Sequence, residues 1–131
     1  MRYMLDTNIC IYIIKNQPQS VAQRFAECNY GEVVMSSVTF AELWHGVVAS
    51  GERMAHNRQT LLALAEDIPV LPFGEVQAEQ FGFYRVLTQN RKAVLDCMIA
   101  AHAHTEGCVL VTNNEQDFRH FTGLQIENWV E

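Results

Sequence analysis

Short apolar runs recur along the chain, and longer segments with apolar residues at helical spacing separate them. Residues 3–5, 33–35 and 108–111 are apolar without alternation, which is typical of strands that helices cover on both faces. Residues 68–73 contain Pro69 and Pro72 and therefore fit only an edge strand. A last short strand is expected over residues 124–126. The pattern predicts a buried, mostly parallel sheet.

Helices are predicted between these strands. One begins near Pro18 and ends near residue 29, and apolar spacing predicts the others over residues 9–15, 38–48, 54–65, 76–87 and 94–103. A short helix near the carboxyl terminus would take Asn113 or Asn114 as its cap and Asp117 in its first turn. Strands that alternate with helices predict an α/β domain with right-handed crossovers.

Four acidic residues follow a predicted strand or stand near the start of a helix, namely Asp6, Glu42, Asp96 and Asp117. Each has an ordinary explanation: Asp6 could cap a helix, Glu42 could face solvent, and Asp96 could be stabilised by backbone N–H groups at a helix start. Parallel sheets, however, bind ligands beyond the carboxyl ends of their strands, where all four would meet. Clustered carboxylates need a cation, and an all-oxygen site suits Mg²⁺ or Mn²⁺ and phosphodiester hydrolysis.

Composition narrows the class of protein. The 131 residues are expected to form one domain, 1–131, and none of the apolar runs reaches membrane-spanning length. The net charge of −6 is weak evidence against nucleic acid, because metal ligation by four of the 15 acids would leave 11 beside nine Lys and Arg. The four cysteines lack zinc-site spacing, so we expect free thiols and a reducing cytoplasm.

Four motifs in order make the chain recognisable: M-L-D-T-N at 4–8, S-S-V-T-F-A-E-L at 36–43, D-C-M-I-A-A-H-A at 96–103 and L-V-T-N-N-E-Q-D-F at 110–118. With them the chain resembles the PIN-domain ribonucleases, and more closely the VapC toxins of bacterial toxin–antitoxin pairs. The resemblance implies a three-layer sandwich with a central, mostly parallel, twisted sheet. It also implies an endoribonuclease that depends on Mg²⁺, or on Mn²⁺ as a substitute, and that inhibits translation.

The resemblance assigns roles to residues. The acidic quartet lands on Asp6, Glu42, Asp96 and Asp117, with Asp6 and Asp96 the best-matched metal ligands. Asn8 and Thr112 match positions that support the quartet by hydrogen bonds. The implied substrates are tRNA anticodon loops or ribosomal RNA, with nothing in the residues to choose between them, and a VapB-like antitoxin is the implied partner.

One stretch departs from the family pattern. Members commonly carry a Gly-x-Pro-Ile-Gly-like loop shortly before the third acid, whereas residues 90–95 here read N-R-K-A-V-L, so the loop looks shortened. Asp96 should keep its place relative to its own helix. Arg91 and Lys92 would then lie beside the metal site, where their charge suits contact with RNA phosphates; the alternative is that both side chains are only solvated, since surface cations need no specific partner.

A homodimer is also expected, because the apolar segments 9–14 and 43–48 exceed what a small core must bury. Trp44, Val47 and Val48 would then lie in the core or in a dimer interface. His102 and His104 are two residues apart and cannot share a helix face, so packing is favoured over metal ligation.

Two other classes of function compete with the nuclease. A receiver domain has a similar size and sheet, but it needs paired acids after the first strand and an acceptor Asp after the third, and residues 71–74 offer none. A degenerate PIN domain would only bind its antitoxin or RNA. Metal-dependent cleavage by purified protein, compared with Asp6→Asn, separates these functions.

Overall fold

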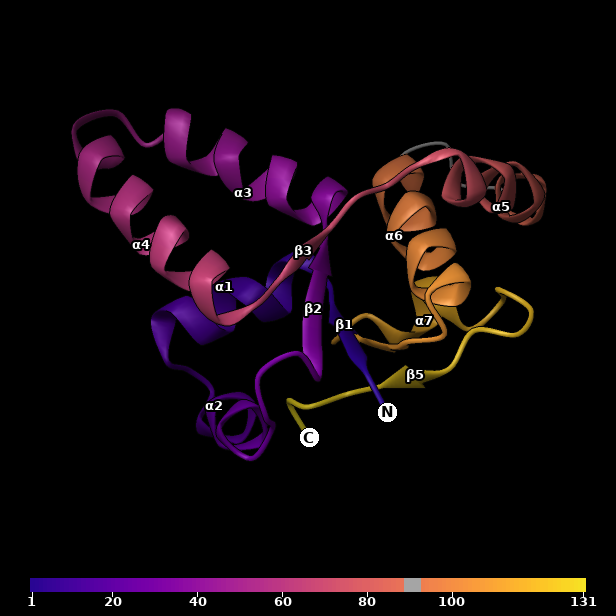
Figure 1. Ribbon diagram of the computed structural model, residues 1–131, viewed down its shortest axis with the longest axis horizontal. Coiled ribbons are helices and arrows are strands. Elements are labelled where there is room, and N and C mark those ends of the chain that lie inside the picture. Colours follow the sequence, from indigo (N-terminus) through magenta and orange to yellow (C-terminus); the bar gives the residue numbers. More distant parts are fainter. Residues whose placement is uncertain (89–92) are drawn as a thin grey trace.

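A computed structural model describes residues 1–88 and 93–131 and shows a five-stranded, all-parallel sheet (Figure 1). The strand order is β3-β2-β1-β4-β5, which places β1 at the centre and β3 at an edge. Tyr3 lies opposite Val33 on one side and Val109 on the other. The predicted α/β class is confirmed. The strands are β1 (Tyr3–Leu5), β2 (Val33–Ser36), β3 (Val70–Leu71), β4 (Val109–Val111) and β5 (Ile126–Glu127).

Helices cover both faces of this sheet (Figure 1). Side chains along a strand alternate between the faces, so Met4 joins the core under α5 and α6 while Leu5 joins the core under α1 to α4. No helix in the described part of the chain is long and apolar enough to cross a membrane. The helices are α1 (Thr7–Lys15), α2 (Gln19–Ala26), α3 (Ser37–Val48), α4 (Met54–Asp67), α5 (Glu75–Leu87), α6 (Val94–Thr105) and α7 (Glu115–Phe118), with a 3₁₀ turn at Gly51–Arg53.

Small residues bring α6 close to the sheet. Ala100, Ala101 and Ala103 are fully buried, and short side chains allow the backbone of a helix to approach its neighbours. Gly107 follows the helix with φ of 66°, a left-handed conformation that costs glycine little. The chain then turns directly into β4, which leads to the carboxyl edge beside β1.

The predicted cap of the last helix is wrong in its detail. Asn114 does stand at the N-cap of α7, but its side chain makes no capping hydrogen bond. Its backbone N–H instead donates to the hydroxyl oxygen of Thr112 at 3.0 Å. The turn is therefore stabilised by a threonine that precedes it, and the carboxylate of Asp117 is not needed for capping.

The apolar segments 9–14 and 43–48 are buried only in part, and Ile14 remains 37% exposed. Ile9, Cys10 and Leu43 are buried, because α1 packs against α2, α3 and α4 within one helical layer. Val47 belongs to the same core, whereas Val48 is 64% exposed. Much of the exposed apolar surface lies on other helices. Half of the large exposed apolar side chains in the described residues belong to α5 and the first turn of α6, namely Val76, Phe83, Val86, Leu87, Val94 and Leu95.

Candidate active site

Asp6 ends the central strand and caps the first helix. Its backbone N–H donates to the carbonyl of Val111 on β4 at 3.1 Å, and its Oδ1 accepts from the N–H of Ile9 at 3.0 Å. The side chain is only 5% exposed. Burial raises the pKa of Asp6, the Thr112 side chain and the Ile9 N–H oppose this rise, and the charge of Glu42 adds to it. Capping and a chemical role are therefore compatible at this residue.

Glu42 is held toward the end of β1 rather than toward open solvent. The hydroxyl of Thr7, the first residue of α1, donates to Glu42 Oε1 at 2.6 Å. This bond joins the amino end of α1 to the second turn of α3. Sequence reasoning missed Thr7, although its place between Asp6 and Asn8 in the first motif was a usable signal.

Asp96 is the third residue of α6, and its environment works against ionisation. Burial, followed by the negative charges of Asp6, Glu42 and Asp117, raises its pKa to about 6. The helix start, the ordinary explanation for an acid at this place, does not keep the pKa of Asp96 low, because desolvation and like charges raise it. The charges of Asp6, Glu42 and Asp117 thus all act on Asp96, and the charge of Glu42 also acts on Asp6.

The remaining predicted residues differ in how closely they are connected to the acidic site. Thr112 is fully buried and hydrogen-bonds the carboxylate of Asp6, while Asn8 contributes through its backbone N–H. Asp117 lies exposed on α7, and its charge has the smallest effect of the three on the pKa of Asp96. Arg91 and Lys92 lie outside the described residues.

The donor set can be tested for its fit to a metal ion. Within residues 1–88 and 93–131, no group of three His, Cys, Asp or Glu side chains is arranged to hold an ion. The chemistry nevertheless fits a hard divalent cation, since the four acids offer only oxygen donors. Their mutual repulsion is the unfavourable interaction that such a cation would relieve.

A cleft of about 550 Å³ opens beside Glu42. Thr7 and Glu42 line it at the acidic edge, and His45 stands one turn further along α3. Its other lining residues are mostly apolar and include Phe73, Leu95 and Met98. A ligand held at the carboxylates would therefore extend over an apolar and aromatic surface.

The fold is a parallel α/β sheet with interacting carboxylates beyond its strand ends. These two features define a class of domain with an acidic site at one edge of the sheet. Residues 3–124 match the family model described as PIN domain. The tRNA(fMet)-specific endonuclease VapC of Shigella flexneri is 39% identical over 132 residues, covering 98% of both chains. Ribonuclease VapC2 of Haemophilus influenzae is 36% identical and covers 99% of both. The DNA-bound VapBC structure from Salmonella typhimurium matches with a TM-score of 0.86 and 34% identity over 98% of each chain. The chain belongs to the PIN-domain family and, within it, to the VapC ribonucleases.

This membership excludes the receiver-domain alternative.

Proposed function

We propose that this chain is a metal-dependent endoribonuclease toxin that hydrolyses RNA phosphodiester bonds and is neutralised by a VapB-like antitoxin. The observation that carries the proposal is the repulsion among the four acids at the sheet edge, which helps to raise the pKa of Asp96 to about 6. A carboxylate in this environment is unfavourable alone and favourable beside a cation. The raised pKa of Asp96 thus supports a cation at this site.

Mg²⁺ is the proposed ion, with Mn²⁺ as a substitute. Asp6 and Asp96 would be its principal ligands, and Glu42 and Asp117 would complete the acidic set. When bound, such an ion supplies Lewis-acid activation of water and of the phosphoryl group. Asp6 follows β1, Glu42 lies in the second turn of α3, Asp96 in the first turn of α6 and Asp117 on α7.

The chain's own residues would orient this set. Thr7 fixes one carboxylate oxygen of Glu42 and so limits the rotation of its long side chain. Thr112 and the backbone of Asn8 do the same for Asp6. Hydrogen bonds of this kind around a metal site commonly affect metal affinity by 10–100-fold.

RNA is the proposed substrate, and it would lie in the cleft beside Glu42. Single-stranded RNA is recognised through unstacked bases that pack on aromatic and apolar side chains, and Phe73, Leu95 and Met98 provide such a surface. Because the relative from Shigella flexneri is named a tRNA(fMet)-specific endonuclease, we propose a tRNA as the substrate. Its cleavage would inhibit translation. Arg91 and Lys92 remain proposed phosphate contacts.

The antitoxin has a candidate docking groove. A groove of about 250 Å³ runs between α1, α3 and α4, where Ile11, Ile14 and Leu43 form apolar walls. It ends at Thr7 and Glu42, so an apolar antitoxin segment seated there would also reach the acidic site. Similar solved structures from Salmonella typhimurium and Rickettsia felis are VapBC assemblies, which supports a VapB-like partner.

A homodimer is proposed through α5. Phe83 and Val86 are 67% and 85% exposed, and Val76 and Leu87 extend the same apolar stripe at helical spacing. Contiguous exposed apolar residues of this kind mark interaction surfaces.

The cytoplasm is the proposed compartment. The four cysteines are free in the structure, and thiols persist in a reducing environment. The proposed RNA substrate is found in the same place.

Cleavage of tRNA by the purified chain tests the central proposal. Wild type should cleave with Mg²⁺ or Mn²⁺ and lose cleavage with a chelator, whereas Asp6→Asn should be inactive under both conditions. Cleavage that survives chelation would contradict the metal dependence. A wild type that binds antitoxin and RNA but never cleaves would establish the alternative, a degenerate PIN domain that acts by binding.

A further inference from the structure

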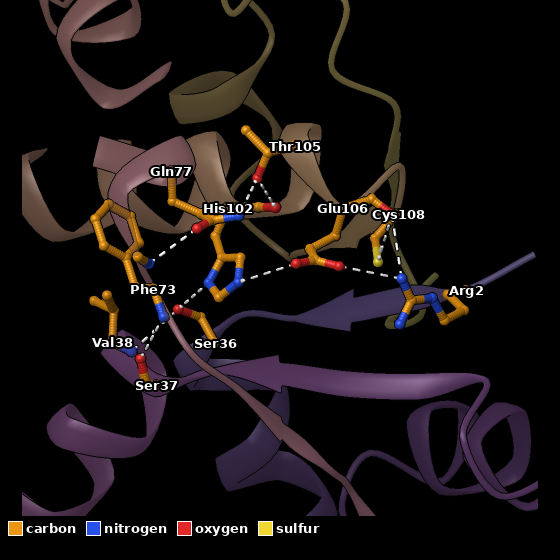
Figure 2. A network of polar contacts seen from close by, with 11 residues as sticks. Arg2, Ser36, Ser37, Val38, Phe73, Gln77, His102, Thr105, Glu106 and Cys108 are labelled. Carbon is orange, nitrogen blue, oxygen red and sulfur yellow. Dashed lines mark hydrogen bonds and ion pairs between the residues drawn. The ribbon is translucent and has the colours of Figure 1, made fainter. Parts of the chain in front are cut away.

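His102 is a fully buried, polar side chain in the last turn of α6, and it joins this helix to the start of α3 (Figure 2). Its Nδ1 lies 2.7 Å from Oγ of Ser36, the last residue of β2 and the N-cap of α3. Ser36 Oγ accepts from the N–H of Val38 at 3.0 Å, so its own proton is free to donate to the histidine. We therefore assign Nδ1 as the acceptor and place the ring proton on Nε2.

The environment of Nε2 indicates that this histidine does more than fill space in the core. Nε2 has no hydrogen-bond partner among the described residues, and its nearest carboxylate oxygen, on Glu106, is 3.9 Å away. Glu106 is engaged with Arg2 at 3.2 Å. A leucine would fill a similar space without leaving a buried donor unsatisfied. The bond to Ser36 is what a leucine could not make.

The bridge has a defined position relative to the acids. Glu42 is six residues beyond Ser36 along α3, and Asp96 is six residues before His102 along α6. At 1.5 Å per helical residue, each carboxylate lies about 9 Å along its helix from the bridge. Helices are stiff over this length, so a fixed contact between Ser36 and His102 also restrains the separation of Glu42 and Asp96.

Neighbouring contacts brace the same junction (Figure 2). The Phe73 ring meets His102 edge-on at 5.7 Å, and the Phe73 N–H donates to Ser37 Oγ at 3.0 Å. Burial lowers the pKa of His102, which keeps the ring neutral and its Nδ1 able to accept, while Glu106 opposes this change. The segment before α5 thereby holds the ring against the first residue of α3.

We propose that His102 is a positioning residue for the metal site: through Ser36 it fixes α6 against the β2–α3 junction and so sets the distance between Asp96 and Glu42. The inference rests on the proposed metal-dependent function. It assigns no contact between His102 and the ion or the substrate. Its consequence is that metal affinity depends on a hydrogen bond about two helical turns from the carboxylates.

Two substitutions distinguish the hydrogen bond between residue 102 and Ser36 from the mere presence of a polar side chain at position 102. In His102→Asn the side-chain oxygen lies about where Nδ1 lies and can accept from Ser36, whereas in His102→Gln it lies about where Nε2 lies and cannot. We expect Asn to keep the wild-type affinity for Mn²⁺ within about threefold and Gln to weaken it about tenfold, as for other indirect supports of metal sites. Mn²⁺ binding by calorimetry and thermal unfolding in chelator are the two measurements, so the test does not depend on activity.

His104→Leu is the matched control, because His104 lies on the same helix and packs on Tyr84 at 5.6 Å instead. It should leave Mn²⁺ affinity unchanged. Ser36→Ala also removes the N-cap of α3, and a double-mutant cycle with His102→Gln subtracts this separate effect. The coupling energy between the two substitutions, measured as Mn²⁺ affinity, should be clearly non-zero. Asn and Gln variants with equal, wild-type affinity would overturn the positioning role alone. A wild type that binds no divalent ion would overturn the proposed function itself.

Discussion

Replacement of Asp96 by asparagine should stabilise the metal-free protein at neutral pH while it removes metal-dependent cleavage. Asparagine has nearly the same shape as aspartate and lacks its charge. The folded state raises the pKa of Asp96 from 3.8 to about 6 through burial and the charges of Asp6, Glu42 and Asp117. Ionised Asp96 is therefore a cost of folding that the neutral variant avoids.

The size of the effect follows from the pKa change. A rise of about two units corresponds to roughly 3 kcal/mol at 1.36 kcal/mol per unit, which is an upper bound. The side chain is partly exposed, so solvent screening reduces the expected gain to about 1–2 kcal/mol. For a chain of this length such a gain raises the Tm by roughly 3–10 °C.

The direction of the pKa change of Asp96 determines the pH range in which its ionisation destabilises the folded protein. The folded protein binds this proton more tightly than the unfolded chain, so the penalty is absent below about pH 4, grows as the pH rises to about 6, and stays constant above that. Thermal unfolding in chelator at pH 4 and pH 7.5 measures it. Wild type and Asp96→Asn should be similarly stable at pH 4, and the variant should be more stable at pH 7.5.

Two comparisons make this result specific. Glu79→Gln removes an exposed carboxylate from α5 and should shift the Tm little at either pH. Saturating Mg²⁺ should stabilise wild type more than Asp96→Asn and so narrow the difference between them. If the variant gains nothing at pH 7.5, or gains equally at both pH values, the electrostatic reasoning is wrong.

Three further predictions concern the orienting hydroxyl, the dimer and the RNA. Thr7→Val removes the hydroxyl that donates to Glu42 and should lower kcat about tenfold with little change in Tm, whereas Thr7→Ser should retain activity; equal rates for all three proteins would contradict the role. Phe83→Glu places a charge in the exposed stripe of α5 and should give a monomer by sedimentation at concentrations where wild type is a dimer. The double variant Arg91→Ala, Lys92→Ala should weaken RNA binding. It should also reduce the steepness of log K against log salt concentration by about 1.4, with the Mg²⁺-induced rise in Tm unchanged.

The sequence alone determined the fold class and the positions of the acids along the chain. Uninterrupted apolar runs identified β1, β2 and β4, and paired prolines placed β3 at an edge. These features depend on neighbours a few residues away, which is why periodicity reveals them. The rule that parallel strands end at one edge then brought Asp6, Glu42 and Asp96 to a common place.

Other features depended on residues far apart in the chain. The bond from Thr7 to Glu42 joins residues 35 positions apart, and the bond between Ser36 and His102 spans 66. Such pairs form only when separate helices dock, and no local pattern encodes them. The placement of exposed apolar residues on α5 rather than on α1 likewise depended on which helices share a layer.

The charge state of Asp96 shows the same division most clearly. Its place at a helix start is local, and by itself predicted a stabilised carboxylate. Its raised pKa is a sum over burial and three acids from other parts of the chain. Sequence could say which groups carry charge, but only the tertiary structure decided how much water and how many like charges surround each one, because electrostatic energy depends on distance and solvation in space.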